Sequence, residues 1–269
     1  MTKLGEFAAD LQVNGLDLAV RAGYAVNPDN VRKELPKAVR LWRDMGLDVG
    51  LLTLETSWVD PFFPPLREIY HVAGESGIPF IKIGYWLWNP EDDYWQRVRT
   101  IRQQVAEFGR LSRETGTVTV LHTHSGGCYG STAHSVMDLA AEAEEEWVGI
   151  YLDPAHLILG GEKLPMALSI VGQRLKVVAA KNAVYSLGNR DGGRRWEVNW
   201  CRLEKGLVNW REAMRLLISQ GFDGPVSVHG EYSLPEDDFR LLDWIGEDVA
   251  FLKQTVEQVI REQKTGGCQ

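Results

Sequence analysis

Short apolar runs alternate with helical patterns along the whole chain. The runs are almost continuous in apolar residues, as expected of parallel strands that are buried on both faces. They lie at residues 15–21, 48–55, 79–86, 117–124, 147–153, 175–181 and 225–231. Repeated strand–helix units of about 30 residues predict a parallel sheet, and this many repeats favour a barrel.

The pattern contains one strand fewer than a closed (β/α)8 barrel requires. Residues 3–13 have a helical pattern, and too little chain precedes them for a strand of about five residues. We therefore expect one α/β domain over residues 1–269, a TIM barrel that lacks its first strand, or a chain whose true start lies upstream. Two bare strand edges invite pairing with another chain, which predicts a homo-oligomer formed across the gap.

Prolines and glycines indicate where the helices begin and end. The Asn-Pro pairs at 27–28 and 89–90 each place a capping residue before a proline, which predicts two helix starts. Gly46, Gly116 and Gly221 stand where the preceding helices should end.

Charge and cysteine content restrict the class of protein. A net charge of −8 argues against a nucleic-acid partner, because phosphate binding favours a basic face. Three scattered cysteines without CxxC spacing indicate a reducing compartment. The start of the chain lacks the apolar core of a signal peptide, and the most apolar stretch, 78–88, is interrupted by Lys82 and too short to span a bilayer. These features predict a cytoplasmic protein without a membrane partner.

Histidines are concentrated where the predicted strands end. His122, His124, His156 and His229 are four of the six histidines, and each lies at or just after the end of an apolar run. Parallel barrels build their active sites at this end of their strands. The chain is therefore predicted to be an enzyme that draws its chemistry from several strands.

Two of these positions combine an imidazole with a neighbouring polar group. In the DPAH motif, Asp153 ends a strand and His156 follows one turn later, so both can face a central cavity and bind Mn, Zn, Mg or Fe. The alternative is a helix-capping aspartate with a hydrogen-bonded histidine. His122 and His124 are two residues apart on one strand, so their side chains share a face and are expected at the barrel mouth.

The last two strands end in further ionisable groups. His229 and Glu231 repeat the two-residue spacing, and the glutamate can bind a metal or act as a general base. A merely polar rim to the barrel is the alternative. Lys181 ends its strand, where a lysine can stabilise an enolate oxygen.

Other residues are candidates for substrate binding because of where they stand. Arg21 and Glu55 end the first two strands, Trp86 follows the third, and Arg21 is a candidate anion clamp. The stretch 186–206 is too long for a bare connection, which predicts a loop that covers the substrate. In this loop Arg194 and Trp196 are expected to close on a ligand, with Arg21 and Arg194 as the contacts for any phosphate.

These motifs together resemble the xylose isomerase-like TIM-barrel superfamily of sugar phosphate isomerases and epimerases, which also holds dehydratases and endonuclease IV. The resemblance rests on GLDLAVR, VLHTHSGG, DPAH, VVAAKN and, most specifically, GLVNWREAMRLLISQGFDGPVSVHGEY. It implies one divalent cation, Mn above all with Mg, Zn or Fe as alternatives, held by a Glu, an Asp, a His and a second Glu. Metal and base then move a proton next to a carbonyl through an enediolate.

Carried onto this sequence, the resemblance changes the expected ligands. Asp153 falls on the metal aspartate and His156 on the substrate-side histidine. His122 takes the place of the first glutamate, as in inosose dehydratase-like members with a His-x-His strand, and His229 that of the last. The usual metal histidine falls on Ala179. The resemblance thus leaves Asp153, His122 and His229 as the metal set.

Two hypotheses of different class follow. The first is a metal-assisted isomerase or epimerase of a small sugar, polyol or sugar phosphate, with Glu231 as the base and Lys181 or His156 stabilising the enediolate. A keto-polyol dehydratase shares its first step. The second is an inactive, metal-free sugar-binding relative, which Ala179 and the missing strand favour. Endonuclease chemistry is disfavoured by the acidic charge and by the loss of metal-ligating residues.

Overall fold

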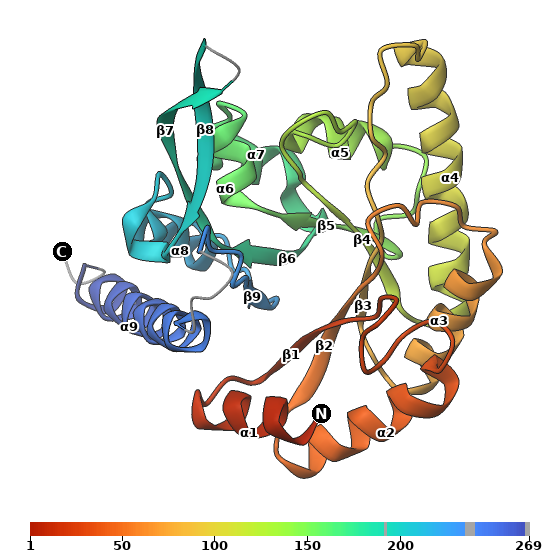
Figure 1. Ribbon diagram of the computed structural model, residues 1–269, viewed down its shortest axis with the longest axis horizontal. Helices are drawn as coiled ribbons and strands as arrows, with labels where there is room; N and C mark the ends of the chain where they lie inside the picture. The colour runs from red at the N-terminus through yellow and green to blue at the C-terminus, as the bar shows by residue number, and fades with distance from the viewer. Residues whose placement is uncertain (191–192, 235–239, 267–269) are drawn as a thin grey trace.

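The computed structural model describes residues 1–190, 193–234 and 240–266. Seven parallel strands form an incompletely closed barrel with helices around it (Figure 1). Their order is β1-β2-β3-β4-β5-β6-β9, so each strand pairs with its predecessor in the barrel. The predicted TIM barrel that lacks one strand is confirmed.

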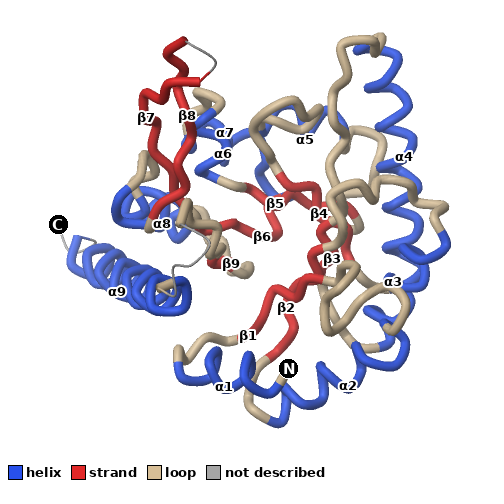
Figure 2. Tube along the Cα trace, in the orientation of Figure 1, coloured by secondary structure: helices blue, strands red, loops and turns tan. Residues whose placement is uncertain are grey.

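Each predicted strand is present, although two of them are short. The barrel strands are β1 (Gly15–Ala19), β2 (Asp48–Thr53), β3 (Phe80–Lys82), β4 (Val118–His122), β5 (Val148–Leu152), β6 (Leu175–Ala180) and β9 (Val226–Val228). The helices are α1 (Thr2–Asp10), α2 (Val31–Asp44), α3 (Pro64–Glu75), α4 (Tyr94–Thr115), α5 (Ala133–Leu139), α6 (Pro154–Leu159), α7 (Leu164–Val171), α8 (Trp210–Ser219) and α9 (Leu241–Gly266). Short 3₁₀ turns, η1 (Gly172–Arg174) and η2 (Leu203–Lys205), complete the chain, and Figure 2 shows how the helices surround the strands.

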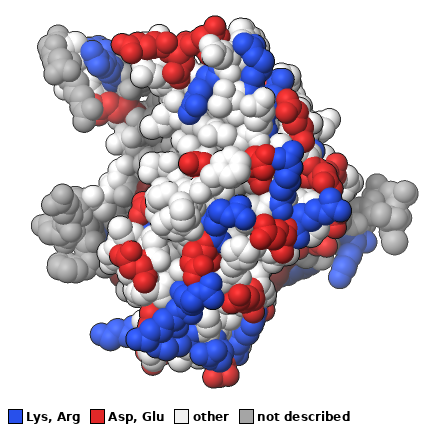
Figure 3. Space-filling view, turned by 90° about the vertical axis from the view of Figure 1, so that its right-hand side faces the viewer, with Lys and Arg blue, Asp and Glu red and all other residues white. Residues whose placement is uncertain are grey.

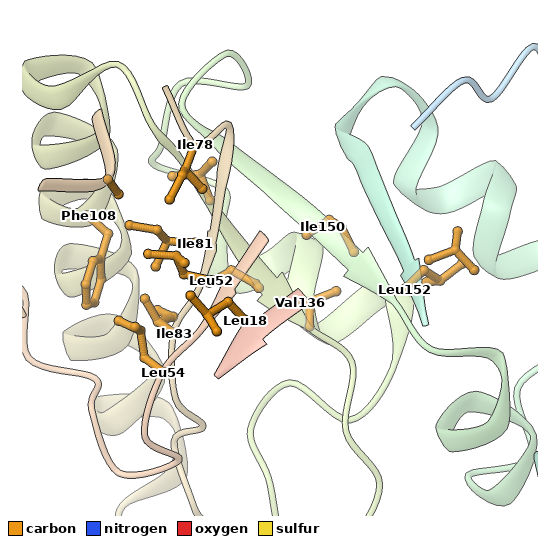
Figure 4. Packing of buried hydrophobic residues seen from close by; sticks show 14 of the residues in the cluster. Leu18, Leu52, Leu54, Ile78, Ile81, Ile83, Phe108, Val136, Ile150 and Leu152 are labelled. Carbon is orange, nitrogen blue, oxygen red and sulfur yellow. The ribbon is translucent and has the colours of Figure 1, made fainter. Parts of the chain in front are cut away.

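The apolar core lies between the sheet and the helices. Figure 4 shows Phe108, on α4, beside Ile81 of β3 and Leu52 of β2, and all three side chains are fully buried. Packing of apolar side chains between a parallel sheet and its outer helices is the main source of stability in such folds. The core therefore fixes where each strand ends.

A second, smaller apolar cluster fills the inside of the barrel. It consists of Leu51, Val120, Tyr151, Val177 and Ala179. Because side chains two residues apart on a strand share a face, the residue two positions further on each strand also points inward, at the barrel mouth. This rule carries His122, Asp153 and Lys181 to the mouth.

Helix ends match the sequence predictions only at their C-terminal side. Gly46, Gly116 and Gly221 follow helices with φ of 78°, 75° and 72°, as predicted. The predicted starts at the two Asn-Pro pairs are wrong, because α2 begins at Val31 and α4 at Tyr94. Both asparagine side chains instead accept a hydrogen bond from the backbone two residues later and form turns before the helices.

The predicted substrate-covering loop over 186–206 is largely an antiparallel hairpin. Strands β7 (Asn182–Arg190) and β8 (Gly193–Cys201) pair along their length and extend away from the barrel (Figure 1). Alternating side chains with frequent β-branched and aromatic residues favour such a ribbon over an irregular loop. The expectation of a loop was wrong because a chain of this length can form a pair of strands on its own.

Side chains bridge the gap between the first and last strands of the barrel. The Asp17 carboxylate of β1 accepts a hydrogen bond from Ser227 Oγ of β9 at 2.9 Å. On the outside, Lys253 Nζ of α9 donates to the carbonyl oxygens of Leu11 and Gln12 at 2.8 and 2.7 Å. The predicted homo-oligomer across this gap stays a prediction.

The outer surface mixes charges of both signs. Figure 3 shows acidic and basic side chains interspersed over one face of the molecule. Ion pairs between neighbouring helices, such as Arg67–Glu114 at 3.2 Å, contribute to this pattern. Among the described residues, no helix has both the length and the apolar character needed to cross a membrane.

Candidate active site

Six ionisable side chains meet at the C-terminal ends of the barrel strands, and we call them the mouth cluster. They are His122, Asp153, His156, Lys181, His229 and Glu231. They are also the six residues that the sequence nominated as metal ligands or catalytic groups. The structure thus brings all six into one network.

Asp153 is the centre of this network and is completely buried. Its Oδ1 accepts hydrogen bonds from the backbone N–H groups of Ala155 and His156, at 2.9 and 3.1 Å, and so caps α6. Its Oδ2 faces His122 Nε2 at 3.2 Å and Lys181 Nζ at 3.3 Å. The helix-capping interpretation of the DPAH motif is therefore confirmed for Oδ1, while Oδ2 belongs to the mouth cluster.

His122 is a neutral imidazole whose two nitrogens are both engaged. Burial, followed by the charge of Lys82, holds the pKa of His122 well below its usual value. The Asp153 carboxylate can only accept, so Nε2 carries the proton and donates it. Nδ1 then accepts from the Tyr85 hydroxyl at 2.9 Å. Burial raises the pKa of Tyr85, which keeps that hydroxyl protonated.

Lys181 lies between two carboxylates. Its Nζ donates to Glu231 Oε2 at 2.9 Å and lies 3.3 Å from Asp153 Oδ2. The same ammonium sits 4.4 Å from the centre of the Trp200 ring, a cation–π contact. Only 4% of the lysine side chain is exposed, whereas 52% of the Glu231 side chain is. The exposed part of this ion pair is therefore the Glu231 carboxylate.

His229 and Glu231 form a charged pair just after the last strand. His229 Nδ1 lies 3.2 Å from Glu231 Oε1, and its Nε2 hydrogen-bonds the Tyr151 hydroxyl at 2.7 Å. Burial alone would lower the pKa of His229, but the Asp17 and Glu231 carboxylates raise it to about 9. Burial alone would raise the pKa of Glu231, but His229 and Lys181 hold it well below its usual range. The pair is therefore an imidazolium and a carboxylate at neutral pH.

His156 provides the cluster with a free ring nitrogen. Its Nδ1 hydrogen-bonds Ser125 Oγ at 2.7 Å, while its Nε2 is buried without a hydrogen-bond partner among the described residues. Burial lowers the pKa of His156 to about 2, so the ring is neutral. It packs against His124 at 4.0 Å and Trp200 at 5.1 Å between ring centres. A buried, unpaired nitrogen is costly and is suited to a hydroxyl group of a ligand.

The predicted substrate-binding residues differ in how near they lie to the cluster. His124 packs directly on His156, and its role in substrate binding stays a prediction. Arg21 donates to the Leu54 carbonyl oxygen and Glu55 accepts from the Ala22 N–H, so these two tie the ends of β1 and β2 together. Neither hydrogen-bonds to the mouth cluster within the part of the chain that the structure describes.

The remaining predicted contacts lie in the core and on the hairpin. Trp86 is buried in the core, where its indole donates to Gln104 at 2.9 Å. Arg194 and Trp196 lie on the outer part of the hairpin, where the Trp196 side chain is 70% exposed. The structure therefore places Arg194 and Trp196 away from the mouth, whereas Trp86 lines a small cavity together with His122.

Three residues of the site escaped prediction. Trp200 contacts Lys181 and His156 from β8, and no feature of its local sequence signals this, because the antiparallel register of the hairpin returns it to the barrel. Tyr151 and Asp17 contact His229 from inside the barrel. Asp17 carried a usable signal, since it is a charged residue within an otherwise apolar strand.

The donor atoms of the mouth cluster do not fit a divalent cation. No three His, Cys, Asp or Glu side chains are arranged as metal ligands among the described residues. Both nitrogens of His122 are engaged, and Lys181 Nζ stands between the Asp153 and Glu231 carboxylates. Ala179 supplies no donor. The Mn site predicted on Asp153, His122 and His229, with Mg, Zn or Fe as alternatives, is thus not formed by this arrangement.

Comparison with known proteins identifies the family. The sequence model of the xylose isomerase-like TIM barrel matches residues 2–255, and the chain belongs to this family. The predicted resemblance is therefore confirmed. No curated protein sequence matches the chain at a significant level.

Solved structures share the fold at low sequence identity. A 3-keto-D-glucoside 4-epimerase from E. coli is 14% identical, with 93% of this chain and 92% of that chain covered and a TM-score of 0.69. A probable 3-DHS dehydratase from Bacillus anthracis is 14% identical, with coverages of 94% and 93% and a TM-score of 0.70. A xylose isomerase-like TIM barrel protein from Mycobacterium smegmatis, solved in complex with magnesium, is 16% identical, with coverages of 96% and 88% and a TM-score of 0.66.

Proposed function

We propose that this chain is an enzyme that moves a proton next to the carbonyl group of a small sugar or keto-polyol, as an isomerase or epimerase. One observation carries the proposal: a half-exposed carboxylate, Glu231, hydrogen-bonds a buried ammonium, Lys181, beside a neutral imidazole, His156, with a free nitrogen. A base, an oxyanion donor and a hydroxyl contact are the groups that enolisation requires. The epimerase and the dehydratase among its structural relatives support the same substrate class.

Lys181 and His156 would hold the substrate. A carbonyl oxygen that approaches from the exposed side of Glu231 accepts a hydrogen bond from Lys181 Nζ, which then stabilises the negative oxygen of the enediolate. His156 Nε2 hydrogen-bonds a neighbouring hydroxyl and so fixes which carbon faces the base.

Glu231 would remove the proton. In the free enzyme the Lys181 hydrogen bond keeps this carboxylate weakly basic. When the substrate carbonyl takes over the hydrogen bond from Lys181, this restraint weakens and Glu231 becomes the stronger base that proton abstraction needs. Delivery of a solvent proton to the opposite face of the same carbon gives epimerisation. Delivery of the proton by Glu231 to the former carbonyl carbon, while the neighbouring hydroxyl proton passes to the former carbonyl oxygen, gives isomerisation. Loss of a β-hydroxyl from the same enediolate would give dehydration, the second candidate reaction.

Proton exchange with solvent tests this proposal directly. Ketoses and keto-polyols are incubated with the enzyme in deuterium oxide, and loss of the C–H signal next to the carbonyl is followed by NMR. We expect exchange with the wild type and a loss of about 100-fold or more in Glu231→Gln, because the amide cannot accept the proton. Glu257→Gln, which changes an exposed glutamate of α9, should behave like the wild type.

The outcomes separate the candidate functions. Exchange with a new sugar as product identifies an isomerase or epimerase, and exchange with loss of water identifies a dehydratase. Ligands that bind without any exchange would contradict the proposal and favour the inactive sugar-binding relative.

A further inference from the structure

We infer that the ammonium group of Lys181 takes the place of a divalent metal ion in this chain. The inference concerns the site of the proposed function and names the group that would polarise the substrate carbonyl there. It rests on where the lysine lies, on what surrounds it and on which donors remain for a metal.

Lys181 is positioned as a bridging cation. In the sheet, β6 lies between β5 and β9, so the residue that follows β6 stands between the residues that follow its two neighbours. Asp153 directly follows β5, Glu231 lies three residues after the end of β9, and Lys181 Nζ lies 3.3 and 2.9 Å from one oxygen of each. Two carboxylates from flanking strands around one cation are the arrangement expected of a metal centre, but here the cation belongs to the chain.

The surroundings hold the ammonium in this position. The side chain is almost completely buried, and the Trp200 ring covers the ammonium at 4.4 Å. Removing the lysine from between the carboxylates would leave the fully buried Asp153 oxygen without its compensating charge, which is costly. The ammonium is thus a fixed part of the site.

A metal ion and this ammonium exclude each other. Metal–oxygen distances are about 2.0–2.6 Å, so an ion bound to the same two oxygens would lie within a few ångströms of Nζ. Repulsion between two cations at that separation is strong in a buried site. The histidines do not offset this, because His122 uses both nitrogens on Asp153 and Tyr85.

An ammonium also acts differently from a metal. Each of its three N–H groups donates to a single oxygen, and the Asp153 and Glu231 carboxylates already occupy part of this capacity, whereas a metal ion can chelate two substrate oxygens together. The reaction at this site should therefore not depend on chelation of neighbouring carbonyl and hydroxyl oxygens.

Metal binding by the purified protein tests the inference without any need for turnover. Isothermal titration with Mn²⁺ is made on the wild type, on Lys181→Ala and on the double variant Lys181→Ala with Asp153→Asn. We expect no Mn²⁺ binding by the wild type at millimolar Mn²⁺. Lys181→Ala should gain one Mn²⁺ site whose affinity is about tenfold or more above the limit set by the wild type, and the double variant should lose this site. Lys253→Ala, which removes a lysine far from the mouth, serves as the charge-matched control and should bind no Mn²⁺.

Several results would overturn the inference. One is stoichiometric Mn²⁺ binding by the wild type that Asp153→Asn abolishes, and this measurement does not depend on whether any lysine variant folds. Another is equal Mn²⁺ affinity in the wild type and in Lys181→Ala, checked for native folding by circular dichroism. If Lys181→Ala gains a Mn²⁺ site but the wild type catalyses no proton exchange, this inference is supported and the proposed function is contradicted. The two proposals can therefore fail separately.

Discussion

At the scale of single residues, hydrogen-bond direction decides what the site can do. The two-residue alternation predicted that His122 lies at the barrel mouth, and it does lie there. Its role as a metal ligand was implied by the family resemblance alone. The lone pair of its Nδ1 is occupied by the Tyr85 hydroxyl, which comes from the segment after β3. Such a contact has no signature in the sequence near His122, so its position was predictable and its chemistry was not.

Gly206 illustrates a constraint set by close contact. A Cβ atom at this position would lie 2.1 Å from Asn182 Cγ, well inside van der Waals contact. Asn182 cannot move away readily, because its amide bonds the Leu203 and Val208 carbonyl oxygens at 2.6 and 2.9 Å. We expect Gly206→Ala to lower the free energy of unfolding by about 2–4 kcal/mol.

The measurement is chemical denaturation followed by circular dichroism. Gly50→Ala is the matched control, because a Cβ atom there meets nothing within 4 Å. A control change within about 0.5 kcal/mol is expected. Equal effects of the two substitutions would show that the contact between Gly206 and Asn182 does not limit the side chain at this position.

At the scale of elements, the hairpin assigns different roles to two tryptophans on one face. Tyr185 pairs with Val198 and Leu187 with Trp196, so these side chains and Trp200 lie on the same side of the ribbon. Trp200, at the base, contacts Lys181 and His156, whereas Trp196 is exposed and touches the Tyr185 ring. The face is shared, but only its base belongs to the site.

Substitution of each tryptophan tests this division. We expect Trp200→Ala to reduce the rate of proton exchange by about tenfold or more, because Lys181 and His156 lose a packed wall. Trp196→Ala should leave the rate unchanged. Steady-state exchange rates on the same ketose check both, and a larger effect at Trp196 would place the substrate along the outer hairpin instead.

The hairpin also shows where sequence reasoning stops. Apolar runs predicted all seven barrel strands, since burial on both faces leaves a strong local pattern. The role of Trp200 depends on the register of two antiparallel strands, and that register is set by pairing between distant residues. Arg194 and Trp196 were chosen because the length of this segment suggested a loop over the substrate, and the strand pairing carries them away from the mouth.

At the scale of the whole molecule, polar side chains inside the barrel join its first and last strands. Asp17 accepts hydrogen bonds from Thr53 Oγ1 at 2.7 Å and Ser227 Oγ at 2.9 Å, and lies 3.8 Å from His229 Nε2. Burial alone would raise the pKa of Asp17, but these groups, with His229 foremost, lower it. A sheet that lacks one strand thus gains an electrostatic closure across its opening, which no local pattern predicted.

This closure should make stability depend on pH. The pKa of His229 is raised from 6.5 to about 9. The contribution of its imidazolium to the free energy of unfolding is therefore fully present below pH 6.5 and is lost as the pH rises through about 9. The pKa of Asp17 is lowered below 3.8, so the contribution of its carboxylate to the free energy of unfolding is present above pH 3.8 and is lost on acidification. Between these limits we expect Asp17→Asn to cost on the order of 2 kcal/mol.

Urea denaturation of the wild type and Asp17→Asn across this pH range measures the difference. The gap in free energy of unfolding should be largest near pH 6 and should shrink above pH 9, where the uncharged His229 no longer attracts the carboxylate. Asp10→Asn, which removes an exposed charge of α1, should show no such pH dependence. A gap that stays constant up to pH 10 would mean that hydrogen bonds to Ser227 and Thr53, rather than the charge pair, hold the first and last strands together.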